Sequence, residues 1–553
     1  MRIVKSLVAA GFLLLPWFVS AQKNLIQSGQ VSGSFQLDAQ YYYEDSLIGA
    51  PKVPEEFGSN AFLNILYTNN KFTAGLRYEN YSNALQGFSK SNNGSGIPYR
   101  FASYTADEME ITVGNFYEQF GSGLMLRTYE DRNIGYDNSI DGVRIKYTVF
   151  KALTMKGLIG RQRLYFEKGP GIVRGFDGEL SMAELFPKML DKQLNVIAGG
   201  SFVSKFQDGS LDPIYKLPDN VGCYGGRLNF IYKNFNLFSE YAYKINDPSA
   251  VNNMIYKPGE ALLVSAAYSK KGFGLLLSAK RIDNMNYRSD RASTGNVLMI
   301  NYLPALTKQH AYTLMAIYPY ATQPNGEMGI MGQVNYKLKK GTLLGGHYGT
   351  DLVLNYSTAY PIQRSAASDT TAIGVPGTLG YQSDFFGVDT TSRYFEDVNI
   401  EISHKFSKKF KAIFMFANMV YNVAVVEGRP GEPLVYANVG VADMTYKFSD
   451  KHSLKLELQH LYTKQDKGSW AMAMAELTIA PKWFAAVGDM YNYGHPETNK
   501  QIHYYTVSAG YIKSATRIAL SYGKQREGLL CVGGVCRYVP AANGFTLSVT
   551  SSF

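Results

Sequence analysis

The chain has 553 residues, of which 14% are aromatic and 18% charged, with 53 Gly and only 3 Cys. This composition excludes a disordered polyampholyte, a disulfide scaffold and a coiled coil. The formal net charge of +10 is spread along the whole chain, which is too diffuse for a nucleic-acid site, so no nucleic-acid partner is expected.

The first predicted element is a secretory signal peptide over residues 1–21. Arg2 and Lys5 precede an apolar run, and small residues before the end of this segment form a cleavage site. Beyond it no stretch approaches the roughly 20 consecutive apolar residues that a spanning helix needs. Residues 22–553 are therefore expected either to cross no membrane or to cross one as strands.

Strands with two different faces follow the signal peptide. From Val31 to Tyr43 apolar or aromatic residues occupy every second position, and polar residues such as Gln36 and Asp38 stand between them. The same period of two returns at residues 72–79, 143–149, 327–338 and 453–458. Each of these segments is predicted to be a strand with one apolar and one polar face.

Short and long links between these strands alternate along the chain. Short polar links occur at residues 68–71, 106–108, 269–272, 339–341, 407–409 and 449–451. Long links occur at residues 44–59, 82–97, 204–220, 244–259, 357–394 and 525–543. Such an asymmetry is typical of a transmembrane barrel, with tight periplasmic turns and longer extracellular loops, whereas a soluble sandwich has no reason to separate them.

The C-terminal segment supports the same fold. Residues alternate from Phe545 to the terminal Phe553, as in the closing strand of bacterial outer-membrane barrels, whose last Phe is read by the barrel-assembly machinery. In hydrocarbon every backbone polar group must be paired internally, so the sheet must close. We predict an all-β, transmembrane, antiparallel up-and-down β-barrel of about 24 to 26 strands, residues 22–553 forming a single domain. Residues 296–324 are compatible with either a hairpin or an inward insertion.

The segment from Gly114 to Tyr147 is rich in charges set among glycines and aromatics. On the lipid-facing wall an Arg at the bilayer midplane would cost about 2 to 4 kcal/mol, so these charges must face the lumen or lie in a loop. A ring this wide is usually plugged or gated. One interpretation is a charged constriction folded into the lumen, and the other is a solvated extracellular loop. The candidates are Glu118, Arg127, Glu130, Asp131, Arg132, Asp137 and Asp141.

Two kinds of modification are predicted in the long loops. Cys531 and Cys536 bracket a Val-Gly-Gly-Val turn and can close a small disulfide in an oxidising compartment, with two free thiols as the alternative. Three short motifs resemble the acceptor motif for O-glycans in exported Bacteroidota proteins, and their acceptors are Ser46, Thr370 and Thr390.

Motifs for catalysis, cofactors and metals are not found. The seven His form no HExxH pair, and neither a GxSxG elbow nor a phosphate-cradling GxxxxGK occurs. No metal constellation is visible in the sequence. We therefore expect no catalytic residues, no cofactor, no metal and no enzymatic activity.

Several segments resemble a family of uncharacterised Bacteroidota outer-membrane β-barrel proteins. The resemblance is carried by GNFYEQFGSGL from Gly114, INYLPALTKQH from Ile300, YPYATQPNGE from Tyr318 and GGHYGT from Gly345. It extends over most of the mature chain and implies location in the cell outer membrane, but it implies no substrate and no functional residues.

Two classes of function are compatible with this architecture. The first is a channel, or the membrane component of a solute transport or secretion assembly, with the polar faces of the strands lining the lumen. The alternative is a structural or interaction barrel whose long extracellular loops bind a partner or a surface polysaccharide, with residues 357–394 as the best candidate loop. The expected partners are outer-membrane lipid, the barrel-assembly machinery during biogenesis and a protein partner in a transport or secretion complex.

Overall fold

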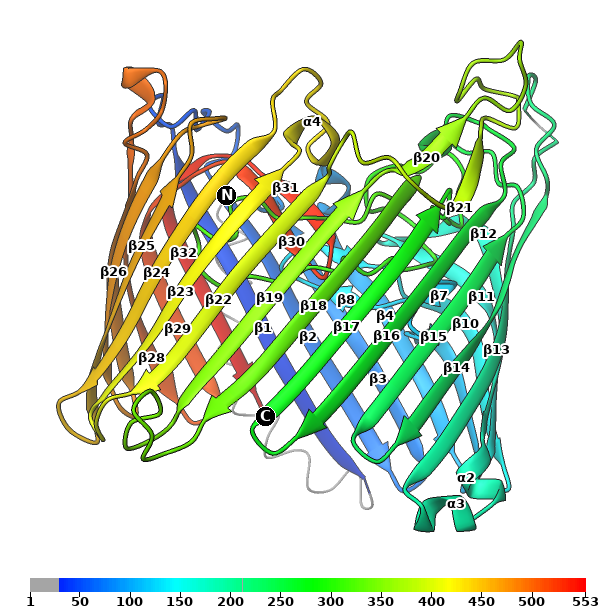
Figure 1. Cartoon of the computed structure of the whole chain (residues 1–553), viewed down its shortest axis with the longest axis horizontal. Coiled ribbons are helices and arrows are strands. Elements are labelled where there is room, and N and C mark those ends of the chain that lie inside the picture. Colours follow the sequence, from blue (N-terminus) through cyan, green and yellow to red (C-terminus); the bar gives the residue numbers. More distant parts are fainter. Residues whose placement is uncertain (1–28, 211) are drawn as a thin grey trace, which may run out of the picture.

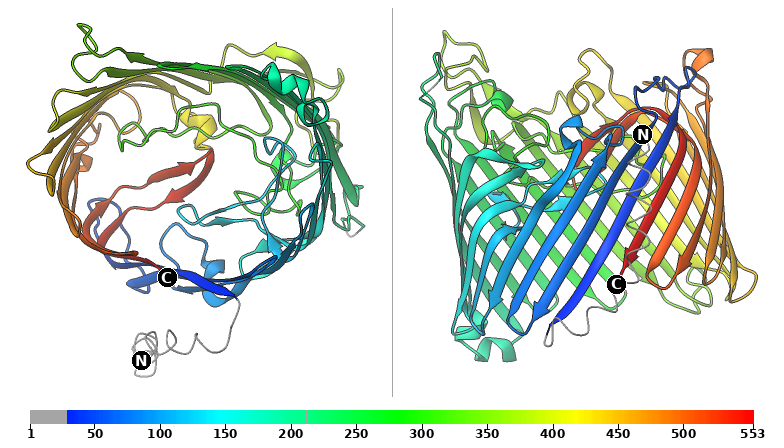
Figure 2. Two further views of the ribbon diagram at one scale, coloured as in Figure 1. Left: turned by 90° about the horizontal axis from the view of Figure 1, so that it is seen from below. Right: turned by 180° about the vertical axis from the view of Figure 1, so that it is seen from behind.

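The computed structural model describes residues 29–210 and 212–553, so the predicted signal peptide lies outside the described residues. These residues form one antiparallel sheet of 24 strands that closes into a barrel (Figures 1 and 2). Closure is direct, because β1 pairs with β2 on one side and with β32 on the other, where Ser34 stands opposite Ser552. The predicted fold class is confirmed, with the strand number at the lower end of the predicted range.

The barrel strands follow one another around the ring in chain order. They are β1 (Gln30–Tyr43), β2 (Phe57–Asn69), β3 (Phe72–Ser82), β4 (Gly94–Thr105), β5 (Met109–Phe116), β10 (Ile140–Val149), β11 (Leu153–Leu164), β12 (Glu167–Ser181), β13 (Leu194–Phe206), β14 (Asn220–Tyr232), β15 (Phe235–Lys244), β16 (Gly259–Lys270), β17 (Phe273–Asp283), β18 (Gly326–Leu338), β19 (Thr350–Tyr360), β22 (Phe395–Lys405), β23 (Phe410–Tyr421), β24 (Val435–Lys447), β25 (His452–Tyr462), β26 (Trp470–Ile479), β27 (Trp483–Tyr491), β28 (His503–Lys513), β29 (Thr516–Gln525) and β32 (Ala542–Ser552).

The outer face of the ring is apolar and the strand alternation explains why. On β10, Val143 and Ile145 are exposed, whereas Arg144 between them is paired with Glu110 and Glu118 inside the ring. Exposed aromatic residues stand near both ends of the strands, among them Tyr41, Phe57, Tyr224, Tyr436, Tyr147, Tyr232, Phe406, Tyr446 and Trp483. An apolar band between two aromatic girdles is the surface of a barrel that spans a membrane.

The two rims differ largely as predicted. The link between β18 and β19, predicted to be short over residues 339–341, is longer and spans residues 339–349. The links on either side of β12 are also exchanged. The link between β11 and β12 lies at the rim of the long loops but has only two residues, Tyr165 and Phe166. At the opposite rim the link between β12 and β13 carries two short helices, α2 (Met182–Leu185) and α3 (Lys188–Asp191), visible at the bottom of Figure 1. In the described part of the chain, no helix is both long and apolar enough to cross a membrane.

Three long loops fold into the ring, as the left view of Figure 2 shows. We call residues 117–139 insertion A, residues 284–325 insertion B and residues 526–541 the disulfide hairpin. Insertion A contains the short strands β6 (Gln119–Phe120), β7 (Leu126–Arg127), β8 (Glu130–Asp131) and β9 (Tyr136–Asp137), and the hairpin contains β30 (Gly528–Val532) and β31 (Val535–Val539). Insertion B, all of which is described, has no strand, so residues 296–324 form an inward insertion and not a wall hairpin.

The lumen face is apolar over two arcs of the ring, which corrects the expectation of a uniformly polar interior. Insertion B covers inward residues of β23 and β24, including Ala417, Met419 and Val439, with its own residues 314–320. Insertion A, together with Met285, Tyr287 and Ile300 of insertion B, covers inward residues of β12 to β17, such as Val203 and Cys223. The inner wall is apolar there because a packed insertion, and not water, lies against it.

The candidate partner-binding segment, residues 357–394, begins within β19, and its loop part, residues 361–394, lies outside the ring (Figure 2). It contains β20 (Ile362–Ser365) and β21 (Gln382–Val388). Tyr381 and Ser383 donate hydrogen bonds to Asp283, and the Arg281 guanidinium lies 4.7 Å from the Phe385 ring centroid. The loop therefore covers the outer wall near the rim and does not enter the lumen.

Candidate functional site

Insertion A is anchored to the barrel wall by a buried ion-pair network. Arg77 on β3 contacts Glu79 at 2.6 Å and Glu130 of the insertion at 2.8 Å, and it also contacts Asp137. Arg163 on β11 contacts Glu79 at 2.6 Å and Asp137 at 2.7 Å. All but Glu130 have side chains that are at most about a tenth exposed, and removing one partner of such a buried pair typically costs about 3 to 5 kcal/mol.

A second anchor holds the beginning of insertion A. The Glu118 carboxylate accepts hydrogen bonds from Lys156 at 2.8 Å and from Arg144 at 3.3 Å, both of which stand on the inner wall. Arg132 pairs with Glu130 at 2.5 Å and lies over the Phe62 ring. The predicted constriction residues are therefore neutralised, Glu118 by wall cations and Glu130 by Arg132, and they fix the insertion in place.

Three of the sequence candidates behave differently. Asp131 accepts a hydrogen bond from the backbone N–H of Asn133 within its own turn. Asp141 does not join the others, because strand alternation puts it on the same outer face as Val143, where it pairs with Lys168 at 2.8 Å. Arg127 lies between the rings of Tyr129 and Tyr302, with centroid distances of 4.8 and 4.1 Å.

Insertion B is anchored by groups that sequence reasoning did not select. Lys280 on β17 pairs with Glu327 on β18 at 2.7 Å, and both side chains are at most 1% exposed. The ammonium of Lys280 also donates to the Pro304 carbonyl and the Thr322 hydroxyl, both at 2.6 Å. The Glu327 carboxylate accepts from the Tyr320 hydroxyl at 2.6 Å. One buried ion pair thus holds the middle and the C-terminal end of the insertion.

Further polar contacts fasten insertion B along its length. His310 contacts Asp397 at 2.8 Å and Lys308 contacts Glu401 at 3.0 Å. The backbone N–H of Leu314 donates to Gln459 at 2.8 Å. Each of these contacts pairs the insertion with a different part of the wall from β22 to β25, so the insertion is fixed as a whole.

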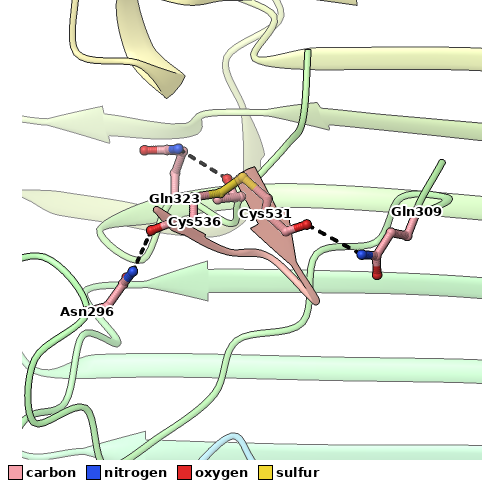
Figure 3. Close-up of a disulfide and its surroundings, with 6 residues drawn as sticks. Asn296, Gln309, Gln323, Cys531 and Cys536 are labelled. Carbon is pink, nitrogen blue, oxygen red and sulfur yellow. Dashed lines mark hydrogen bonds between the residues drawn. A yellow bond between two sulfur atoms is a disulfide. The ribbon is translucent and has the colours of Figure 1, made fainter. Parts of the chain in front are cut away.

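The disulfide hairpin is held more lightly (Figure 3). Cys531 and Cys536 form a disulfide across its turn, and the hairpin's own backbone carbonyls accept most of the hydrogen bonds that reach it. Asn296 donates to the carbonyl of Cys536 at 2.5 Å and Gln309 donates to that of Cys531 at 3.4 Å. Tyr302 donates to the Gly533 carbonyl. No contact of this hairpin with insertion B is a buried ion pair among the described residues.

Side chains hold the root of the hairpin. Arg537 donates to the Gln86 carbonyl at 3.2 Å and lies over Phe88, and this burial lowers the pKa of Arg537 to about 10. The Glu527 carboxylate accepts from Lys467 at 2.8 Å and from Tyr538 at 2.7 Å, and these hydrogen bonds hold its pKa below its ordinary value.

Two cavities flank β30 inside the ring. One of about 520 Å³ lies against the inner wall from β26 to β29, β32 and β1, where Thr506, Ser521 and Thr546 supply hydroxyl groups. The other, of about 680 Å³, lies between the hairpin and insertion B. Arg526, Leu529 and Leu530 line both of them, so the hairpin is the partition between the two spaces.

The remaining sequence candidates lie outside this region. The acceptors Ser46, Thr370 and Thr390 are exposed in long loops at one rim. Within the described part of the chain no group of three or more His, Cys, Asp or Glu is arranged to hold a metal ion. Sequence reasoning missed Arg526, whose only signal was a cation directly after a wall strand.

The comparisons with known proteins concern the whole chain. It matches a family of unknown function, DUF6029, over residues 3–553. The chain belongs to this family. No curated protein sequence matches this DUF6029 chain.

Solved structures with a similar fold are large barrels. The P pilus usher PapC translocation pore is 8% identical, with a TM-score of 0.43, over 95% of this DUF6029 chain and 99% of that chain. The siderophore receptor PirA from Pseudomonas aeruginosa is 10% identical, with a TM-score of 0.41, over 95% and 80% of the two chains. An E. coli P pilus tip assembly intermediate, PapC-PapD-PapK-PapG, is 8% identical, with a TM-score of 0.48, over 94% and 60%.

Proposed function

We propose that this protein is an outer-membrane channel whose passage is closed by the disulfide hairpin. The observation that carries the proposal is the position of β30, which separates cavities of about 520 and 680 Å³ inside a closed ring. Displacing the hairpin would join the two spaces. Insertion A stays in place because its Asp137 pairs with Arg163 of the wall. Insertion B stays in place because the buried Lys280–Glu327 pair of the wall holds it by hydrogen bonds.

The hairpin suits the role of a movable element. Its contacts with insertion B end on its backbone carbonyls, which water satisfies once the hairpin moves away. The disulfide keeps the turn between Cys531 and Cys536 intact, so the hairpin would move as one body about its root. No step of this function requires catalysis, and the proposed role is that of a passage and not of an enzyme.

Conductance of the purified protein in planar lipid bilayers tests the proposal. Replacing residues 528–539 by a Gly-Gly link removes the partition and is expected to raise the single-channel conductance severalfold. A matched control shortens the outer loop by removing residues 366–380, which lie outside the ring, and is expected to leave conductance unchanged. Equal conductance of wild type and hairpin deletion would refute the gate.

A second function, binding of a protein partner by the outer loop, is favoured by one observation. Phe386 on β21 is 81% exposed, and Leu379 in the same loop is 60% exposed, although apolar side chains of this size are usually covered. Affinity purification from native membranes tests this role by comparing the full-length protein with a form that lacks residues 366–380 and also carries Phe386→Ser. A partner that is retained equally by both forms would exclude the loop as its binding site.

A further inference from the structure

We infer that the larger cavity is a binding site for a small organic anion, a carboxylate on an apolar body, centred on Arg526. The inference deepens the proposed channel function by naming the class of solute. It rests on the charges, the apolar surface and the position of this cavity.

The wall of the larger cavity carries basic but no acidic side chains among the described residues. Among the described residues that line it there is no Asp or Glu, whereas Lys308, His310 and Arg526 all contribute. Lys308 is neutralised from behind by Glu401, and His310 is hydrogen-bonded to Asp397. Arg526 is then the cation left to receive an anion.

The guanidinium of Arg526 has unused hydrogen-bonding capacity. One of its N–H groups donates to the backbone carbonyl of Glu527 at 2.9 Å, and no carboxylate of the described residues lies within 4.0 Å of it. The nearby carboxylates Glu427 and Asp466 are instead held by Arg429, at 3.3 and 2.8 Å. A guanidinium presents five donors in a planar fork that matches a carboxylate, so a bound carboxylate would satisfy the unused donors.

Apolar and aromatic side chains make up much of the remaining wall. Tyr318, Tyr320, Phe395 and Met419 line the cavity opposite the hairpin residues. A volume of about 680 Å³ is within the usual range for small-molecule sites, which are mostly apolar with few polar groups that fix orientation. A solute with both a carboxylate and an apolar body therefore fits this wall better than a bare inorganic anion.

Arg526 also links binding to passage. It lines the cavities on both sides of β30 and stands two residues before that strand begins. An anion held by Arg526 therefore sits at the root of the partition, where either cavity can receive it.

Equilibrium binding to the full-length protein in detergent micelles tests the inference without any need for conductance. Isothermal titration calorimetry would use benzoate, its neutral analogue benzamide and inorganic phosphate. Benzoate is expected to bind at least tenfold more tightly than benzamide, because a hydrogen bond to a charged group contributes more than a neutral one. Phosphate, which lacks the apolar body, is expected to bind more weakly than benzoate.

The variant Arg526→Gln is expected to lower benzoate affinity at least tenfold and leave benzamide binding unchanged. The matched control is Arg517→Gln, which removes another inward cation of β29, stacked on Phe484 and far from the cavity. Benzoate binding that survives in Arg526→Gln, or that falls equally in both variants, overturns the site. Phosphate binding as tight as benzoate binding overturns the class of solute.

Conductance recorded from the same preparations separates the two proposals. Specific benzoate binding without any channel activity would leave the site standing and remove the channel. Channel activity in a protein that binds benzoate no more tightly than benzamide would leave the channel standing and remove the site. Thermal unfolding of each variant shows whether Gln at position 526 has only destabilised the fold, and a variant that unfolds is replaced by Arg526→Lys, which keeps the charge and loses the fork.

Discussion

Replacing Lys280 by Met is expected to release insertion B from the wall. In wild type the Lys280 ammonium meets the Glu327 carboxylate at 2.7 Å, and both are almost fully buried. Met removes the cation and leaves that carboxylate buried without its charge partner, which typically costs about 3 to 5 kcal/mol. The anchored form loses this free energy relative to the released form, where water reaches Glu327.

The released fraction of insertion B should rise by a factor of about 100 or more, since 1.4 kcal/mol corresponds to tenfold. Limited chymotrypsin digestion of the folded barrel measures it, because Tyr320, which is followed by Ala321, is only 5% exposed and becomes cleavable on release. When reclosing is faster than cleavage, the cleavage rate follows the released population. Cleavage after Tyr320 should therefore accelerate about a hundredfold.

Two further variants make the test sharp. Lys337→Met breaks an exposed pair between β18 and β19, Lys337 with Asp351 at 2.7 Å, and is expected to change cleavage little because exposed pairs contribute about 0 to 1 kcal/mol. Adding Glu327→Gln to Lys280→Met removes the buried charge and should restore much of the resistance. Wild-type cleavage in Lys280→Met, or no restoration by Gln, would refute the anchoring role.

Other expected outcomes concern the hairpin, a buried thiol and the outer loops. The hydrogen bonds that lower the pKa of Glu527 stabilise the root of the hairpin fully above about pH 4.5, the ordinary pKa of this carboxyl group, and this stabilisation is lost as pH falls through the lowered pKa. Conductance should therefore rise on acidification, and Glu527→Gln should abolish this rise. Cys223 is completely buried and should resist maleimide in the folded barrel and react after unfolding, and labelling of the folded form would contradict the packing of insertion A. Mass spectrometry of protein from its native source should find glycan on Ser46, Thr370 and Thr390, and unmodified peptides would dispose of the motif-based prediction.

The wall of the barrel was predictable from local pattern. Alternation over residues 143–149 put Val143 outward and Arg144 inward, as the structure has them. The same alternation, continued back by one pair of residues, already placed Asp141 on the outer face. Asp141 belongs to the wall strand β10 and not to insertion A, so a high local content of charged residues does not by itself place a residue in the lumen.

The contents of the lumen could not be predicted in this way. On β24 both Val439, which faces insertion B, and Tyr436, which faces outward, are apolar or aromatic, so the pattern there does not reveal which side is covered. Arg127 meets Tyr302 only because two loops far apart in the chain fold into one space. The partition formed by the hairpin depends on similar long-range contacts, for which no local sequence signal exists.

The hydroxyl-lined cavity lies against β32 and β1, the two strands that join the ends of the chain. In the proposed channel, a solute in this cavity would pass along the junction between β1 and β32 and not through the centre of the barrel. Across the same junction the Ser548 hydroxyl donates to Asp38 at 2.6 Å. Incorrect pairing of β1 with β32 during biogenesis would therefore change the shape of this cavity first. The parts of the wall that are packed against insertions A and B would keep their form.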